Sequence, residues 1–268
     1  MPRAFFTLPL LAAVLCSGAK ADTTIRYISV DGSDEVLGIQ RMHVSSTQMA
    51  ITAEGSDITT VFDAEKGQLF TVDRDNETVM EIEPEALADK AEQHIQTRVK
   101  VLEGMEARLA QIPKEEREKL QTVMDEIHEV NRKATEEPLE TQYVGRPEIA
   151  KIGDFDAKVI DAFRGERLTG TYFLVDKSKL GIGDEEFAVI EAFQFFLHLL
   201  SEKMPAGMRK GLGDYDLLVS DEGEIPVEKH KFDAAGARES REILNGVNHE
   251  AIGETIFELP AEFERVSP

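Results

Sequence analysis

Histidines are the first side chains to consider for chemistry, because histidine is the commonest general acid, general base and metal ligand near neutral pH. The sequence has six, and each stands alone: His43, His94, His128, His198, His230 and His249. No two of them are spaced as metal ligands on one helix or strand. The sequence also contains no His-Glu-x-x-His, no Gly-x-Ser-x-Gly and no phosphate-binding loop. This pattern predicts no metal centre and no familiar catalytic site.

Two loop segments resemble ligand-binding loops only superficially. Residues 73–77 read Asp-x-Asp-x-Glu, like the start of a calcium loop, but Thr78 stands where glycine is needed and Pro84 is the twelfth residue. A hairpin turn is therefore predicted there. Residues 179–184 have two glycines but no P-loop lysine, so they are predicted to lead into a helix and not to bind a nucleotide.

Clustered carboxylates are the remaining candidates for acid and base chemistry, which needs two carboxyls held across a cleft in unequal environments. The clusters at 115–116 and 184–186 fall in the expected first turns of helices, where acidic side chains suit the helix dipole. His198 lies on the polar stripe of the most apolar helix. It could act there as a pH-sensitive latch, or it could be a partly exposed, hydrogen-bonded histidine. We expect no enzymatic activity and no cofactor.

The N-terminus predicts export. Arg3 precedes an apolar stretch at 4–14 that is too short to span a bilayer, and Ala19-Lys20-Ala21 has the spacing of a signal-peptidase site. We therefore expect a signal peptide at 1–21, cleavage after Ala21 and a periplasmic protein. The alternative is a lipoprotein anchored through Cys16, although Leu15 stands where a small residue would be expected. Cleavage after Ala21 would leave no cysteine in the mature chain.

The charge balance excludes several classes of partner. The chain has 30 Lys and Arg against 52 Asp and Glu, a formal net charge of -22. Such a field repels phosphate backbones and anionic lipids, so nucleic acid is excluded as a partner, as is membrane attachment through a basic patch. The most apolar later segment, 187–200, is too short to span a bilayer and holds Glu191 and His198. We expect a protein that is not integral to a membrane.

The elements that would position any site follow the order β, α, β in a single domain at 22–268. The first part predicts a six-stranded antiparallel meander, because short β-prone runs alternate with turn clusters. Its candidate strands are 24–30, 37–45, 48–53, 58–62, 68–72 and 77–82. Large apolar residues adjoin one another in two runs, at 61–62 and 69–70, and neighbours in a strand point to opposite faces. We therefore expect the sheet to be covered on more than one side.

Residues 84–137 are predicted to form an inserted helical hairpin, because apolar residues recur every three or four positions on both sides of Pro113. Charged residues of both signs occupy the rest of these helices, which is typical of a solvated face. The β pattern then returns, with candidate strands at 141–144, 157–163, 169–175, 215–220, 225–232 and 238–247.

An apolar helix is predicted at 184–204, capped by Asp184 and interrupting the second β part. Its apolar residues leave only a narrow polar stripe. Leaving these side chains in water would forfeit on the order of 10 kcal/mol, so the helix must cover something apolar.

Four segments carry a family resemblance: a strand pair at 69–82, a hinge between charged helices at 109–117, strands at 152–176 and the chain end at 256–260. In this order they resemble an uncharacterised bacterial envelope family related in architecture to the lipoprotein carriers LolA and LppX. The resemblance implies an α+β fold with an incomplete antiparallel barrel of about eleven strands. It also implies helices over the open side and an apolar cavity that can hold acyl chains, with no catalytic residue to carry over.

Two functions from different classes follow. In the first, the protein is a non-enzymatic carrier or sensor of a lipid, an acyl chain or another hydrophobic ligand. Its candidate cavity residues are Phe62, Phe70, Met80, Phe173, Phe193, Phe196 and Leu200. In the second, the helices fill the cavity and the protein is an envelope interaction or regulatory module that binds a protein partner through the helix pair. A carrier predicts a void beneath the apolar helix, whereas a module predicts dense packing there and an exposed apolar patch elsewhere.

Overall fold

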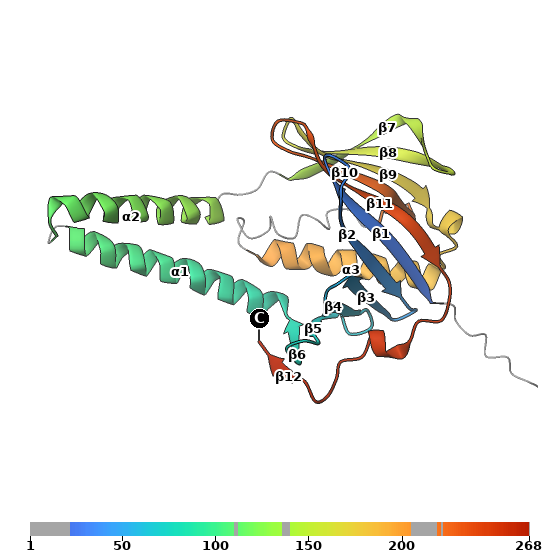
Figure 1. Cartoon of the computed structure of the whole chain (residues 1–268), viewed down its shortest axis with the longest axis horizontal. Coiled ribbons are helices and arrows are strands. Elements are labelled where there is room, and N and C mark those ends of the chain that lie inside the picture. The colour runs from blue at the N-terminus through green and yellow to red at the C-terminus, as the bar shows by residue number, and fades with distance from the viewer. Residues whose placement is uncertain (1–21, 110–111, 136–139, 205–218, 221, 268) are drawn as a thin grey trace, which may run out of the picture.

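The computed structural model describes residues 22–109, 112–135, 140–204, 219–220 and 222–267. The expected signal peptide, Cys16 and most of the strand expected at 215–220 lie outside these residues. Within them, the protein is an α+β fold in which one open, mostly antiparallel sheet of 12 strands is accompanied by three α-helices (Figure 1). No helix in this part of the chain is long and apolar enough to cross a membrane.

The N-terminal half of the sheet is the expected six-stranded antiparallel meander, with each strand paired to the next in the chain. Its strands are β1 (Thr23–Asp31), β2 (Val36–Val44), β3 (Gln48–Ala53), β4 (Ile58–Asp63), β5 (Gln68–Asp73) and β6 (Thr78–Ile82). Residues 73–77 form a β5–β6 turn in which Asp73 accepts hydrogen bonds from the backbone of Asp75 and Asn76. This agrees with the expected hairpin turn.

The C-terminal half is a second antiparallel meander that joins the first through its last long strand. Its strands are β7 (Thr141–Ile152), β8 (Phe155–Arg164), β9 (Arg167–Asp176), β10 (Glu224–Phe232) and β11 (Arg238–Asn248). β11 pairs with β1, and the short strand β12 (Glu264–Val266) pairs in parallel with β6. β12 is not among the candidate strands, since three residues without an apolar alternation give no strand signal.

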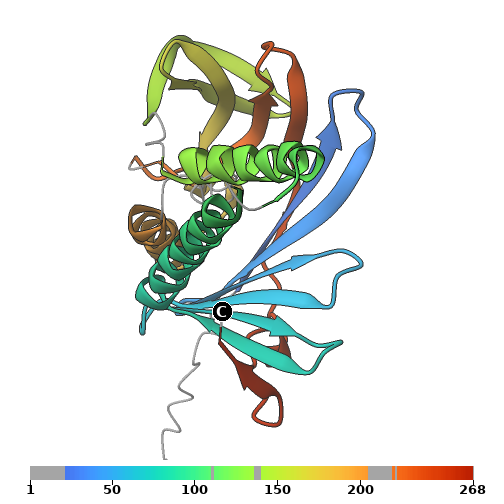
Figure 2. The same cartoon turned by 90° about the vertical axis from the view of Figure 1, so that its left-hand side faces the viewer.

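The edges of the sheet are β12 and β7, and they are not paired with each other. Viewed from the side, the sheet is an open, curved surface with the three helices on its hollow side (Figure 2). β7 extends to Ile152, well beyond the predicted end at Val144, because the chain continues through a bulge between Gly145 and Ile149. Pro147 lies in this bulge, where an edge strand tolerates a residue without an N–H donor.

The helical hairpin consists of α1 (Pro84–Leu109) and α2 (Lys114–Thr135), as the apolar periodicity predicts. It leads from β6, beside one edge of the sheet, to β7 at the other, and its far end projects beyond the sheet (Figure 1). The start of α1 is held to the body by Leu87, which packs on the main hydrophobic cluster, and by an ion pair of 2.9 Å between Glu85 and Lys203.

The apolar helix α3 (Asp184–Lys203) fills the hollow of the sheet. Its N-cap is Gly183 and not Asp184, which belongs to the first turn, where a carboxylate suits the helix dipole. Its buried residues join inner-face side chains of the sheet in the main hydrophobic cluster: Phe187, Val189, Ile190, Phe193, Phe196, Leu197 and Leu200.

A second, smaller cluster covers the outer face of the first meander, as the adjacent apolar residues predict. It contains Ala50, Val61, Phe70, Val72 and Val79. The C-terminal segment packs over it through Ile256, Phe257, Leu259 and Phe263. The sheet is therefore covered on both sides, by α3 within and by the chain end outside.

Candidate binding groove between the two long helices

The structure brings four of the predicted cavity residues together. The Phe62 ring lies 5.4 Å from that of Phe193 and 5.6 Å from that of Phe196, measured between centroids, and Leu200 is buried in the same cluster. Phe193 is 1% exposed and Phe196 7%. α3 is therefore the element that packs against Phe62 on the inner face of the sheet.

Phe70 must be removed from the predicted set. It belongs to the outer cluster, under the C-terminal segment, whereas its neighbour Leu69 belongs to the inner cluster. Strand alternation forces this separation, and β4 repeats it with Val61 outside and Phe62 inside. Where two apolar residues are adjacent in a strand, the sequence does not show which of them faces α3.

Met80 and Phe173 lie at the margins of the inner face. Met80 is half-buried and follows Val79, which belongs to the outer cluster. Phe173 is half-buried, packs against the main cluster, and lies 5.1 Å from the His230 ring. Neither contributes to the aromatic group around Phe62.

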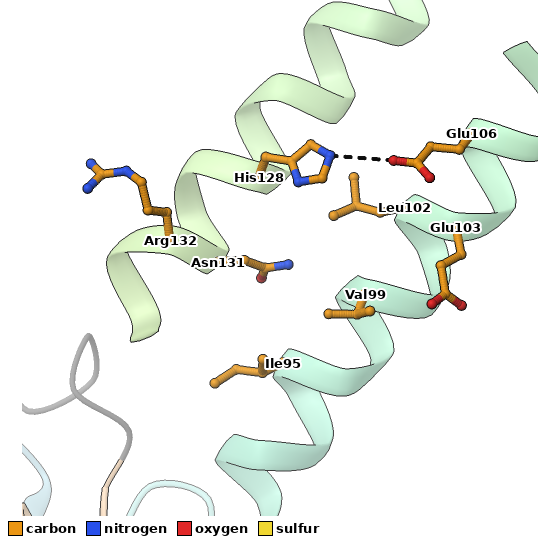
Figure 3. A pocket seen from close by; sticks show the side chains of 8 residues that line it. All are labelled: Ile95, Val99, Leu102, Glu103, Glu106, His128, Asn131 and Arg132. Carbon is orange, nitrogen blue, oxygen red and sulfur yellow. Dashed lines mark ion pairs between the residues drawn. The ribbon is translucent and has the colours of Figure 1, made fainter. Parts of the chain in front are cut away.

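A solvent-open groove of about 400 Å³ lies between α1 and α2, away from the predicted cavity (Figure 3). Its apolar floor is a helical stripe on α1 formed by Ile95, Val99 and Leu102, at the i, i+4 and i+7 positions that share one face. Leu102 is buried, Ile95 is half-buried, and Val99 remains 42% exposed. The stripe is thus only partly covered by α2.

Polar side chains border this floor. Glu103 and Glu106 come from α1, and His128, Asn131 and Arg132 come from α2. His128 Nε2 lies 3.8 Å from a Glu106 carboxylate oxygen, the pair drawn dashed in Figure 3. Arg132 donates two hydrogen bonds of 2.8 Å to Glu129. The groove therefore combines an apolar floor with an edge that carries two carboxylates on α1.

The sequence pointed to the residues of this groove but not to their role. Ile95, Val99 and Leu102 follow the helical periodicity and are naturally interpreted as the buried seam of a hairpin. Only the structure shows that α2 covers the stripe incompletely. The sequence did contain one signal. The helices of the hairpin are long, and two helices that pack only on each other bury little apolar surface.

The other candidate groups do not form a site. The Asp184 side chain is 94% exposed and pairs at 2.8 Å with Lys177. The His198 side chain is 67% exposed and lies 3.3 Å from Glu202, one turn along α3. Within the described residues, no group of three or more histidine, cysteine or acidic side chains could hold a metal ion.

Comparisons with known proteins do not identify a family for this chain. No family model matches the sequence, and no curated protein matches it. Among solved structures, the chain is similar to an uncharacterized conserved protein from Thermus thermophilus, with 5% identity and a TM-score of 0.44 over 93% of this chain and 92% of that one. It is also similar to PNGF-II, with 8% identity and a TM-score of 0.42 over 92% of this chain but only 31% of that one. Similarities of this size carry no argument about fold or function.

Proposed function

We propose that the protein is a non-enzymatic interaction module of the cell envelope that binds an amphipathic helix of another protein in the groove between α1 and α2. The observation that carries the proposal is the open, partly apolar groove on a helix pair that projects from the sheet. An amphipathic helix binds such a groove by placing apolar residues at i, i+3 and i+4 on its floor. Val99, being both central and 42% exposed, is the natural anchor point.

The carboxylates at the edge of the groove predict a positively charged partner. Glu103 has no ion-pair partner among the described residues, and Glu106 meets only His128, at 3.8 Å. A helix whose apolar stripe is flanked by Lys or Arg would place cations beside both carboxylates. The net charge of -22 adds a long-range attraction that raises the association rate of such a helix.

A peptide experiment tests this function. The probes are two synthetic helical peptides with the same leucine stripe, one flanked by lysines and the other by glutamates, with binding followed by fluorescence anisotropy. We expect binding of the lysine peptide only, and Val99→Asp should weaken it about tenfold or more, because a carboxylate would then lie in the apolar floor. The matched control is Val36→Asp, since Val36 is 65% exposed on the body of the protein.

The direction in which Val99→Asp changes the peptide affinity distinguishes binding in the groove from general electrostatic attraction to the acidic protein. The substitution makes an acidic protein more acidic, so a peptide held only by charge would bind Val99→Asp as tightly as Val36→Asp, or more tightly. That result, or equal binding of both peptides, would reject the groove as the binding site.

We also propose a second candidate function, as a carrier of a lipid or acyl chain, because the sheet presents a continuous apolar inner face that α3 covers. A ligand would have to insert between α3 and this face, gaining about 0.8 kcal/mol for each buried CH₂ group. The residues that it would contact are Phe62 and the partners of Phe62 on α3, with Met80 and Phe173 at the margins.

Native mass spectrometry before and after organic extraction tests the carrier. The expected result is a lipid-sized adduct that extraction removes and that Phe196→Asp weakens. Phe195→Asp is the matched control, because Phe195 lies on the same helix but is 62% exposed. A bare mass, with no uptake of added fatty acid or lipopeptide, would exclude the carrier.

A further inference from the structure

His128 stands at the edge of the groove, and histidine is the side chain whose charge ordinarily changes near neutral pH. It comes from α2, and its Nε2 atom lies 3.8 Å from a carboxylate oxygen of Glu106 on the opposite helix (Figure 3). The His128 side chain is 53% exposed and that of Glu106 is 57% exposed, so solvent protons reach the imidazole. Because Glu106 is one of the two carboxylates that would meet a cation of the partner, the protonation of His128 bears directly on the proposed binding site.

The charges around His128 decide what its protonation would do. They come from both helices: Glu103 and Glu106 on α1, and Asp125 and Arg132 on α2. Asp125 and Arg132 lie about one turn to either side of His128 on its own helix. Arg132 is already paired with Glu129, at 2.8 Å. Glu106 lies within ion-pair distance of the His128 ring, so a protonated imidazole would pair with it.

We propose that protonation of His128 regulates the groove, so that the cationic partner binds near neutral pH and is released as the medium becomes acidic. The inference rests on the interaction module proposed above and adds its regulation. A neutral imidazole leaves the Glu106 carboxylate to pair with a lysine or arginine of the partner. An imidazolium at the same position pairs with Glu106 and also repels the cations of the partner. Both effects weaken the same complex.

The exposure of the two side chains sets the size of this effect. Water and salt screen charges at an exposed ion pair, so its loss changes an affinity by a small factor and not by orders of magnitude. We expect the partner to bind about threefold to fivefold more weakly when His128 is protonated. The difference should shrink as salt rises, because the competing ion pairs are all screened.

A pH comparison on the full chain tests the regulation. The probe is the lysine-flanked helical peptide, whose affinity is measured by fluorescence anisotropy at about pH 7.5 and about pH 5.5. Lysine side chains do not titrate in this interval, so the charge of the peptide stays constant. Circular dichroism at both pH values establishes that the chain is folded. We expect weaker binding at the lower pH.

Three variants assign the effect to one side chain. His128→Gln keeps a polar group but cannot gain a proton, so it should bind the peptide equally well at both pH values. His128→Lys carries a permanent positive charge and should bind weakly at both. The matched control is His94→Gln, which should keep the full pH dependence, because His94 is exposed on α1 and is not among the side chains that line the groove.

Two results would overturn the regulation: a pH dependence that His128→Gln retains, or His128→Lys binding as tightly as the unmodified protein. The regulation and the groove can also fail separately. Peptide binding that Val99→Asp weakens but that is equal at the two pH values rejects the regulation and leaves the proposed function standing. Absence of peptide binding at both pH values rejects the proposed function, and the regulation with it.

Discussion

At the scale of single residues, Phe62 joins the sheet to the helix that fills it. Phe62 is 2% exposed, and its ring lies close to the rings of Phe193 and Phe196 of α3. We expect Phe62→Ala to lower the free energy of unfolding by about 3 to 5 kcal/mol, through lost burial and the cavity left behind. Phe195→Ala, at an exposed site of α3, should change it by about 0.5 kcal/mol or less. Urea denaturation measures both, and similar losses would mean that α3 is not packed as described.

His43 should make stability depend on pH. It lies on β2, with Nδ1 3.1 Å from the Thr24 hydroxyl and Nε2 3.3 Å from the Thr52 hydroxyl. Burial, assisted by the nearby positive charge of Arg41, lowers the pKa of His43 below its ordinary value of 6.5. The unfolded chain therefore binds a proton more readily than the folded protein does. Stability should be highest above pH 6.5 and should fall as the pH drops from 6.5 toward the lower folded pKa.

The pH effect is checked with two glutamine variants. His43→Gln keeps hydrogen-bonding groups but cannot gain the proton, so the decline in unfolding free energy below pH 6.5 should become smaller. His198→Gln, at a side chain that is 67% exposed, should leave the decline unchanged. The assignment to His43 fails if its variant retains the full decline.

At the scale of elements, the C-terminal segment acts as the cover of the outer face. β12 pairs with β6, and the residues before β12 pack on Phe70 and Val72. The backbone N–H of Glu264 also donates a 2.9 Å hydrogen bond to the Glu77 carbonyl. Without this segment, β6 would become an exposed edge strand beside an uncovered apolar cluster.

Truncation after Gly253 should therefore increase amide hydrogen exchange in β5 and β6. Exchange at the seam between β1 and β11, in the middle of the sheet, should change much less. The control is removal of residues 267–268 alone, which leaves β12 complete. Uniform acceleration across the sheet would show that the segment stabilises the whole fold and not this face.

The strand β7 is longer than the local sequence pattern predicts. The sequence predicts a strand only at 141–144, and Gly145 and Pro147 follow it. The strand nevertheless continues, since Arg146 in the bulge donates hydrogen bonds of 2.7 and 2.9 Å to the nearly buried carboxylate of Asp161 on β8. A contact between residues 15 positions apart thus supports a strand that runs past its predicted end.

For the whole molecule, the net charge of -22 produces self-repulsion. A net charge of -22 opposes the compact state, and added salt screens it within a Debye length. We expect the Tm to rise between about 0.01 M and 0.5 M sodium chloride, where the Debye length falls from about 30 Å to a few ångströms. Potassium chloride at the same ionic strength should give the same rise. A Tm that is constant, or that depends on the cation, would indicate that screening is not the cause.

The sequence by itself determined much of this protein: the first meander, the helical hairpin, the apolar helix and a strongly acidic surface. These follow from short-range properties, namely the periodicity of apolar residues, the turn residues and the count of charges. Periodicity does not decide which of two adjacent apolar residues faces α3, so the sequence predicts Phe70 beside Phe62 although it lies on the other face.

Only the tertiary structure decided the pairing of β1 with β11, the parallel addition of β12 and the position of α3 in the hollow of the sheet. These contacts join parts of the chain that are far apart, and no local pattern encodes them. It likewise showed that α2 covers its partner helix incompletely. Whether an apolar stripe becomes core or an open groove depends on which surface packs against it, and that is a property of the assembled fold.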